Sequence, residues 1–180
     1  MDLGLKDRVA IVTASSQGIG RATAESFAAE GCRLAMCARN AGTLEAAADK
    51  IRKQAGVEVF TAAFDVTHAG SVHTFVDAVA EKFGSVDICV TNAGGPPAKG
   101  FMAASIDDWR KAVDANFLST VYFARAVAPQ MQRKRWGRIV TLTSVSVRQP
   151  VPDLVLSNAV RTFRFGSGFV SDLACDLELA

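Results

Sequence analysis

Residues 13–20 read Thr-Ala-Ser-Ser-Gln-Gly-Ile-Gly, and this stretch decides the fold. It follows the apolar run Val9–Val12 and precedes apolar residues at helical spacing. In a strand, turn and helix of this kind, backbone N–H groups at the helix start can hold a pyrophosphate. Gly18 and Gly20 allow the close approach, but Ala14 stands where the first glycine often lies. A plain connecting turn remains the alternative for this stretch alone.

Five near-continuous apolar runs alternate with helical patterns along the chain. Strands that are apolar on both faces predict a parallel sheet covered by helices on each side. The sequence therefore predicts an α/β fold, a Rossmann-type doubly wound parallel sheet in a single domain, with ligands at the carboxyl ends of the strands. The predicted strands are residues 9–13, 34–38, 57–63, 86–91 and 139–143.

Four helices are predicted between these strands. The first follows the glycine turn, the second is centred on Leu44–Ile51, and the third runs from Val72 to a stop at Gly84. The fourth is longer and is expected to kink at Pro129. Its predicted apolar stripe consists of Val113, Phe117, Val121, Ala124 and Ala128.

Composition excludes several classes of function. The 180 residues are 49% hydrophobic with a net charge of +2, which argues against nucleic acid or a membrane surface as partner. The cysteines lack metal spacing, and Cys37 and Cys89 lie in predicted strands, so we expect buried thiols, no metal site and a reducing, cytoplasmic location. The basic cluster Arg133–Arg135 is better read as cations at a helix end than as a nucleic-acid patch.

Arg39 follows the second predicted strand, about 20 residues beyond the glycines. An acidic side chain at this place usually meets the free 2′-hydroxyl of NAD, whereas an arginine can pair with the 2′-phosphate of NADP. Arg21 is a candidate second partner. We therefore expect NADP in preference to NAD. The alternative is a solvated arginine in a loop.

With these motifs in place, the chain resembles the short-chain dehydrogenase/reductase family, in particular its 3-oxoacyl-carrier-protein reductase-like members. The likeness covers about residues 5–161 and includes a glycine motif, Asp65-Val66, Asn92-Ala93-Gly94, Asn116 and Ser144. It implies a small-molecule or acyl substrate and a homodimer or homotetramer. The cofactor-binding residues that it implies are Thr13, Ser15, Ser16, Gln17, Gly18, Ile19, Gly20, Arg39, Asp65, Val66, Asn92, Ala93 and Gly94.

The resemblance also assigns catalytic positions. Asn116 matches the asparagine of the family's proton relay, and Ser144 matches the serine that holds the substrate carbonyl. The family's YxxxK motif is expected thirteen residues after that serine, where this chain has Ser157 and Arg161. An aliphatic hydroxyl is a far weaker acid than a phenol, and an arginine keeps its proton permanently. We therefore expect these two replacements to give a catalytic site that is impaired or altered. The only tyrosine, Tyr122, lies in the fourth helix and cannot replace the motif.

The end of the chain departs from the family pattern. From Thr162 glycines and phenylalanines interrupt the expected buried helix, so we predict a Rossmann domain over residues 1–161 and an atypical tail over 162–180 that continues the last helix. In the tail an apolar stripe is expected at Val160, Phe163, Val170, Leu173 and Leu177. The family's last two strands are expected to be missing, through truncation or a frameshift, which would leave the fifth strand as a sheet edge.

Two functions follow from these observations. The first is an NADP-dependent oxidoreductase acting on a carbonyl or alcohol, with Ser157 and Arg161 in place of the usual acid and its partner. The second is a non-catalytic NADP-binding protein that keeps the fold for binding or regulation. The missing tyrosine favours the second, and the retained Ser144 and Asn116 favour the first.

Overall fold

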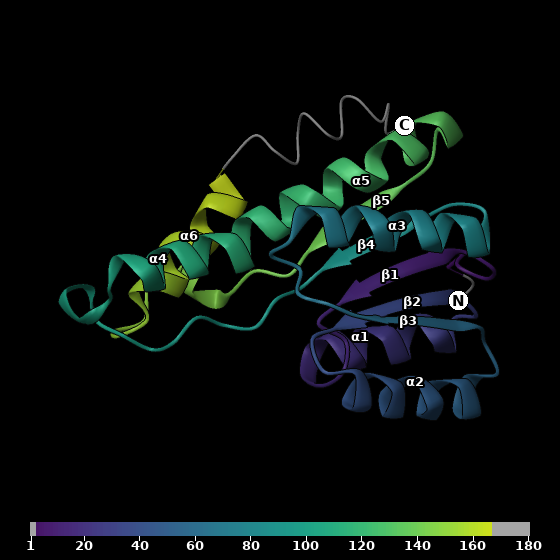
Figure 1. Ribbon diagram of the computed structural model, residues 1–180, viewed down its shortest axis with the longest axis horizontal. Coiled ribbons are helices and arrows are strands. Elements are labelled where there is room, and N and C mark those ends of the chain that lie inside the picture. Colours follow the sequence, from purple (N-terminus) through teal and green to yellow (C-terminus); the bar gives the residue numbers. More distant parts are fainter. Residues whose placement is uncertain (1–2, 167–180) are drawn as a thin grey trace.

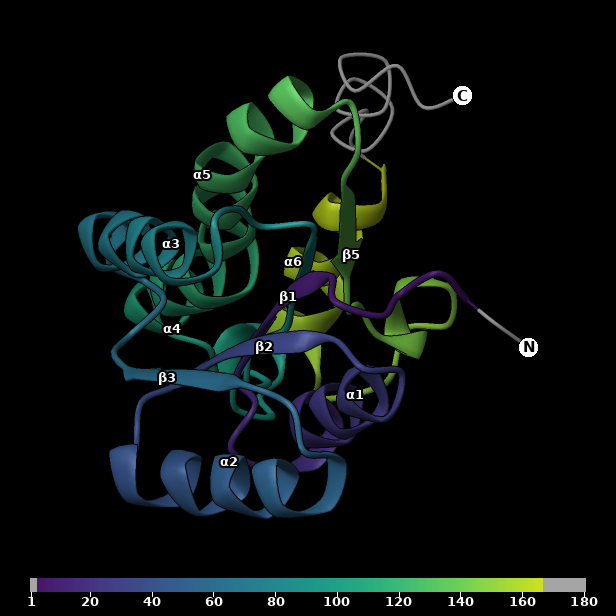
Figure 2. The same cartoon turned by 90° about the vertical axis from the view of Figure 1, so that its right-hand side faces the viewer.

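A computed structural model describes residues 3–166 of the chain. Five parallel strands form one sheet in the order β3-β2-β1-β4-β5, which confirms the predicted doubly wound α/β fold. Helices cover both faces of this sheet (Figures 1 and 2). The strands are β1 (Val9–Thr13), β2 (Arg33–Ala38), β3 (Val59–Ala63), β4 (Ile88–Thr91) and β5 (Arg138–Thr141).

The helices α1 (Gly18–Ala29) and α2 (Ala41–Ala55) pack on one face of the sheet, and α3 (Ala69–Phe83) and α5 (Ser119–Lys134) pack on the other (Figure 1). Two further helices, α4 (Ile106–Val113) and α6 (Val155–Gly166), pack against each other beyond the carboxyl ends of the strands. Three short elements complete the chain: η1 (Phe101–Ala103), η2 (Asp114–Leu118) and η3 (Val145–Val147).

Several predicted strands are longer than the observed ones. β3 and β4 begin two residues later than the apolar runs that predicted them, and β5 ends two residues earlier. Apolar patterning reports burial, whereas a strand extends only as far as its hydrogen-bonded partner. Val86, for example, is fully buried, but its N–H donates to the side chain of Gln130 and not to a neighbouring strand.

Each face of the sheet buries its own apolar cluster. Val9, Ile11 and Cys89 pack with α3 and α5, while Ala10 and Val12 pack with α1 and α2. Such alternation on two buried faces is what a doubly covered parallel sheet requires. Cys32, Cys37 and Cys89 are buried and free, as predicted, and burial raises the pKa of the Cys37 thiol to about 12. Cys175 lies outside the described residues.

The prediction of one long fourth helix was wrong in its details. Between α4 and α5 the chain forms the π-helix η2, which shifts the side chains that follow it around the helix axis. Val113, just before η2, and Phe117, within it, pack toward α6. Phe123, Val127 and Met131 pack in the cluster against the sheet, and of the predicted stripe in α5 Ala124 is buried, whereas Val121 and Ala128 are only partly buried. Pro129 lies inside α5.

The tail that was predicted from residue 162 lies mostly outside the described residues. α6 continues from Arg161 to Gly166 without a break at the predicted boundary. Val160, the first member of the predicted apolar stripe, is buried. In the described part of the chain β5 lies at one edge of the sheet, and no helix there is both long and apolar enough to cross a membrane.

The turn after β1 depends on a close approach that only glycine permits. A Cβ atom at Gly20 would lie 2.3 Å from the carbonyl oxygen of Ala14, well inside van der Waals contact. Ala14 itself has a φ of 49°, a left-handed conformation that costs a residue with a Cβ roughly 1 kcal/mol. The helix is therefore seated directly on the end of the strand.

At the amino ends of the strands, a buried carboxylate connects two strands with a helix. Asp87 is 3% exposed, accepts a hydrogen bond from the N–H of Val9 at 2.9 Å, and pairs with Lys134 at the end of α5 and with Arg8. The guanidinium of Arg8 in turn lies 3.8 Å from the centre of the Trp136 ring. Asp87 thus fixes β1, β4 and α5 to one another.

Substitution of Gly20 by alanine should destabilise the protein by about 2 kcal/mol or more, because the turn must open to admit the Cβ atom. Gly70→Ala is the matched control: Gly70 lies in α3 with open space around it, and this change should stabilise by up to about 1 kcal/mol. Thermal unfolding of both variants measures the difference. Equal changes in stability for Gly20→Ala and Gly70→Ala would show that the turn after β1 has room for a Cβ atom at Gly20.

Asp87→Asn should lower the free energy of unfolding by about 1.5 to 3 kcal/mol, because it removes the charge from the hydrogen bonds and ion pairs that the buried carboxylate makes with the N–H of Val9 and with the partly exposed Lys134 and Arg8. Asp49→Asn is the control, since Asp49 pairs with Arg52 at the exposed surface of α2, where such pairs contribute less than about 1 kcal/mol. Urea unfolding of the two variants gives the comparison. A loss at Asp87 as small as that at Asp49 would show that the buried pair is dispensable.

Candidate functional site

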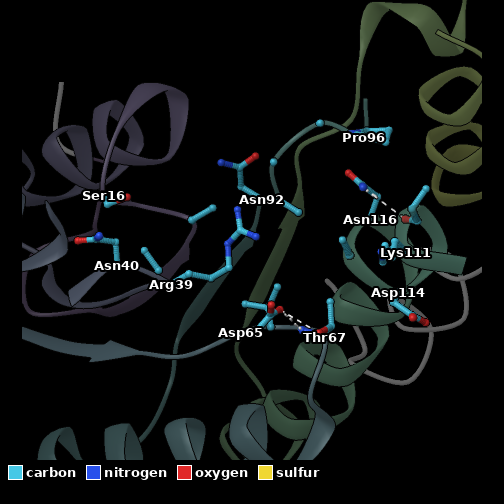
Figure 3. Close-up of a pocket in the computed structure, with 18 of the residues that line it drawn as sticks. Ser16, Arg39, Asn40, Asp65, Thr67, Asn92, Pro96, Lys111, Asp114 and Asn116 are labelled. Carbon is cyan, nitrogen blue, oxygen red and sulfur yellow. Dashed lines mark hydrogen bonds between the residues drawn. The ribbon is translucent and has the colours of Figure 1, made fainter. Parts of the chain in front are cut away.

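A cleft of about 980 Å³ opens at the carboxyl ends of the strands, where the turns after β1, β2, β3 and β4 meet α4 and η2 (Figure 3). Its position is the one expected for a ligand in an open parallel sheet. Ten of the predicted site residues line it: Ser16, Gln17, Gly18, Arg39, Asp65, Val66, Asn92, Ala93, Gly94 and Asn116.

The other predicted residues of the first turn do not line the cleft but shape it. Thr13 is 1% exposed, and its hydroxyl donates to the carbonyl of Asn92 at 2.6 Å and accepts from the Asn92 N–H at 2.7 Å. Ser15 is fully buried and its N–H donates to the carbonyl of Cys37. Ile19 is 69% exposed, and Gly20 is the close-approach residue described above. These contacts join the ends of β1, β2 and β4.

Arg39 leaves the end of β2 with an exposed side chain that extends into the cleft near Asp65 (Figure 3). Asp65 accepts hydrogen bonds from the N–H and hydroxyl of Thr67, at 3.0 and 2.9 Å. Burial raises the pKa of Asp65, but the Thr67 hydrogen bonds and the charges of Arg39 and His68 outweigh it, so the pKa lies below its usual value. Asp65 is therefore a carboxylate at neutral pH.

Arg21 does not join this group. Its guanidinium forms an ion pair with Glu25, one turn further along α1, at 3.3 Å. It does not line the cleft, so Arg39 is the arginine placed to meet a ligand there. Asn40 does line the cleft, but its side chain caps α2 by accepting from the N–H of Thr43.

The loop after β4 is held against the helices that flank the cleft. The ammonium of Lys99 lies 2.7 Å from the carboxylate of Asp108, which also closes the capping box at the start of α4 with Ser105. Lys99 and Ser105 together hold the pKa of Asp108 well below its usual range. The same residue joins the loop to α6, because the N–H of Val155 donates to the backbone carbonyl of Lys99.

Asn116 lies within the π-helix η2 and is 1% exposed. Its Nδ2 donates to the carbonyl of Ala112 at 3.3 Å (Figure 3), and its buried Oδ1 has no partner among the described residues. A buried amide oxygen without a partner is unusual and is satisfied by an added water or ligand. The geometry is compatible with the water-ordering role that the sequence predicted.

Ser144, Ser157 and Arg161, the other predicted catalytic residues, do not line the cleft. The hydroxyl of Ser144 accepts from the N–H of Ser146 and so caps η3. Ser157 and Arg161 lie one turn apart on the buried side of α6, each 9% exposed. Arg161 Nη1 donates to the carbonyl of Thr143, next to Ser144, and burial lowers the pKa of Arg161.

Tyr122 packs in α5 against the apolar cluster on that face of the sheet and does not line the cleft. It therefore does not take the place of the missing phenol. Among residues 3–166 no cluster of His, Cys, Asp or Glu side chains has the arrangement of a metal site.

Among the residues that line the cleft and were missed by the sequence reasoning are Thr67, Lys111 and Asp114. Thr67 could have been found, because it follows Asp65 by two residues, the spacing of a turn closed by an aspartate side chain. Lys111 and Asp114 carried no such signal, since charged residues on a helix most often mark its solvated side.

Comparison with known proteins agrees with this geometry. Residues 8–177 match the family model described as short chain dehydrogenase. The chain belongs to the short-chain dehydrogenase/reductase family. The match extends beyond residue 161, where the sequence analysis placed the end of the resemblance.

Within this family, an uncharacterised oxidoreductase of Staphylococcus saprophyticus is 34% identical over 142 residues, which are 79% of this chain and 61% of that protein. The 3-oxoacyl-[acyl-carrier-protein] reductase FabG of Escherichia coli is 33% identical over 143 residues, 79% of this chain and 57% of its own length. The chain thus spans about three fifths of the curated relatives that it matches.

Solved structures of the same family superpose closely. L-sorbose reductase from Gluconobacter frateurii, complexed with NADPH and L-sorbose, has a TM-score of 0.93 at 31% identity, covering 98% of this chain and 68% of the other. An NAD⁺-bound xylitol dehydrogenase has a TM-score of 0.89 at 28% identity, covering 96% of this chain and 67% of the other.

Proposed function

We propose that this chain binds NADP(H) in the cleft and acts as an oxidoreductase on the carbonyl or alcohol of a small-molecule or acyl substrate. The observation that carries the proposal is Arg39, an exposed guanidinium at the end of β2 that lines the cleft. The neighbouring structures hold both cofactors, NADPH in L-sorbose reductase and NAD⁺ in xylitol dehydrogenase, so the choice of NADP depends on this residue.

The residues of the cleft suit an adenine dinucleotide. The turn over Ser16–Gly18 presents the N-terminal N–H groups of α1, which favour a pyrophosphate. Arg39 would bind the 2′-phosphate, and Asp65 and Val66 would border the adenine. Asn92, Ala93 and Gly94 would lie along the remaining part of the cofactor.

Bound NADPH would supply the hydride for carbonyl reduction. Ser144 would then hold the substrate oxygen, and Asn116 would order the water that delivers a proton to it. Without a phenol the proton transfer is slower, and loss of a general acid typically costs about 10² to 10⁴ in rate. We therefore expect slow turnover.

The second candidate function is NADP binding without catalysis. It is favoured by one specific observation: Ser157 and Arg161, which the resemblance matches to the acid and its partner, are both buried on α6, and Tyr122 lies elsewhere. Oxidation of bound NADPH by any member of a carbonyl panel separates the two functions.

The chain is expected to work in the cytoplasm, as a homodimer or homotetramer, with no nucleic-acid or membrane partner. Buried free cysteines and the balanced net charge of +2 support this setting.

Arg39→Gln should weaken NADPH binding by about tenfold to a hundredfold, because it removes a charge-assisted contact to the 2′-phosphate. Binding of NADH, which lacks that phosphate, should stay the same. Arg21→Gln is the matched control, since Arg21 pairs with Glu25 outside the cleft and should leave the NADPH to NADH ratio unchanged. Fluorescence titration of both cofactors tests this, and an unchanged ratio in Arg39→Gln would refute the assignment of NADP.

The double change Ser157→Tyr with Arg161→Lys should raise the rate of NADPH oxidation with a carbonyl substrate by at least about tenfold, since it restores a phenol beside an ammonium. Single-turnover absorbance at 340 nm measures it, with NADPH affinity as the control for an intact cleft. Unchanged affinity without a gain in rate would mean that more than the acid is missing.

A further inference from the structure

The loop between β4 and α4 borders the cleft but is held mainly at its two ends. Asn92 and residues 93–97 line the cleft (Figure 3). At the first end, the hydroxyl of Thr13 forms the two hydrogen bonds with the backbone of Asn92 that are described above. Residues 93–98, called the strap below, carry no polar side chain. Their backbone groups form no hydrogen bond with any other residue that the structure describes.

Lys99 holds the second end of the strap. Its ammonium lies 2.7 Å from Oδ2 of Asp108 on α4, and the exposed fractions of the two side chains are 37% and 18%. Its backbone carbonyl accepts a hydrogen bond from the N–H of Val155, the first residue of α6, at 3.3 Å. Lys99 therefore joins the strap to both helices that lie beyond the carboxyl ends of the strands.

Between these two ends the strap has the composition of a hinged segment. Gly94 and Gly95 permit wide rotation of the backbone, whereas Pro96 and Pro97 restrict it. A Cβ atom at Gly94 would have no described atom within 4 Å, so the space around this residue is open. A segment with so few contacts moves at a low cost in free energy. The position of the strap over the cleft consequently depends on how firmly its ends are held.

We propose that Lys99 is a positioning residue, and that its ion pair with Asp108 holds the strap over the cleft and thereby slows the escape of a bound dinucleotide. This inference rests on the proposed function. The pair suits the task because a charge-assisted hydrogen bond is stronger than a neutral one. Its partial exposure to solvent allows it to break and re-form, so the strap can open for a ligand to enter and then close over it.

The first test measures how fast NADPH leaves the cleft, by stopped-flow displacement with excess NADP⁺. Dissociation from Lys99→Met should be about tenfold faster than from the parent protein, with a much smaller change in the association rate. Lys99→Arg should restore most of the retention, since a guanidinium also pairs with a carboxylate. Lys50→Met is the matched control, because Lys50 is exposed on α2 outside the cleft and dissociation should be unchanged.

The role of the pair must be separated from the role of Asp108 in capping α4. Ser105→Ala removes a partner of the cap but leaves Lys99 and Asp108 in place, so NADPH should dissociate as from the parent protein. Asp108→Asn should speed dissociation, and adding Lys99→Met to it should have no further effect, because the pair is already broken. Additive effects, or an effect of Ser105→Ala as large as that of Lys99→Met, would overturn the proposal.

A second test needs no cofactor. The N–H of Val155 lies in the first turn of α6, where an N–H has no helical acceptor, and its acceptor is the carbonyl of Lys99. Lys99→Met keeps this carbonyl but releases the end of the strap, so hydrogen exchange of the Val155 amide should become about tenfold faster. Exchange of the Asn158 amide, which donates to Leu154, should stay the same. Unchanged exchange at Val155 would show that the ion pair does not hold the strap.

Failure of this inference and failure of the proposed function are distinguishable. If NADPH does not bind to the parent protein, the proposed function is wrong, and exchange of the Val155 amide still decides whether Lys99 holds the strap. If NADPH binds but leaves the parent protein and Lys99→Met at the same rate, NADP binding stands and retention by the strap is wrong.

Discussion

The contact between α1 and the end of β1 is the constraint on which the rest of the molecule depends. The helix can start where it does only because Gly20 has no side chain to meet the carbonyl of Ala14. The hydroxyl of Thr13 simultaneously joins this strand end to Asn92 after β4. One turn thereby sets the position of the helix N-terminus, its free N–H groups and the loop across the cleft. Polar groups from four strand ends meet in one place as a consequence.

Much of this arrangement could be predicted from the sequence because it follows from local patterns. Apolar runs and glycine positions predict the strands, the helices and the turn, and the topology brings the strand ends together. The residues at those ends, such as Arg39, Asp65 and Asn92, consequently line one cleft, and their roles in cofactor binding stay predictions. What periodicity could not supply was the end of each strand, which depends on the hydrogen-bonded partner.

Other features depend on three-dimensional contacts that no local pattern reports. Ion pairing with Glu25 keeps Arg21 away from the cleft, although its position in the sequence resembled that of a phosphate ligand. The burial of Arg161, which pairs with no carboxylate among residues 3–166, depends on how α6 packs against η3 and α4. The π-helix arises inside a segment whose apolar residues are compatible with a continuous α-helix, so nothing in the spacing indicated it.

That π-helix has a consequence for how this segment can change length. A π-turn holds one more residue than the α-turn that it replaces, so removal of one residue from Asp114–Leu118 would restore a regular α-helix and leave the elements on either side in place. Met131 would stay against the sheet, and Lys134 would stay beside Asp87 at the far end of the molecule. A single-codon deletion elsewhere in α4 or α5 would instead rotate everything C-terminal to it by about 100° and break both contacts. The segment around Asn116 is therefore the part of this helix pair whose length can change without a loss of packing at the amino ends of the strands.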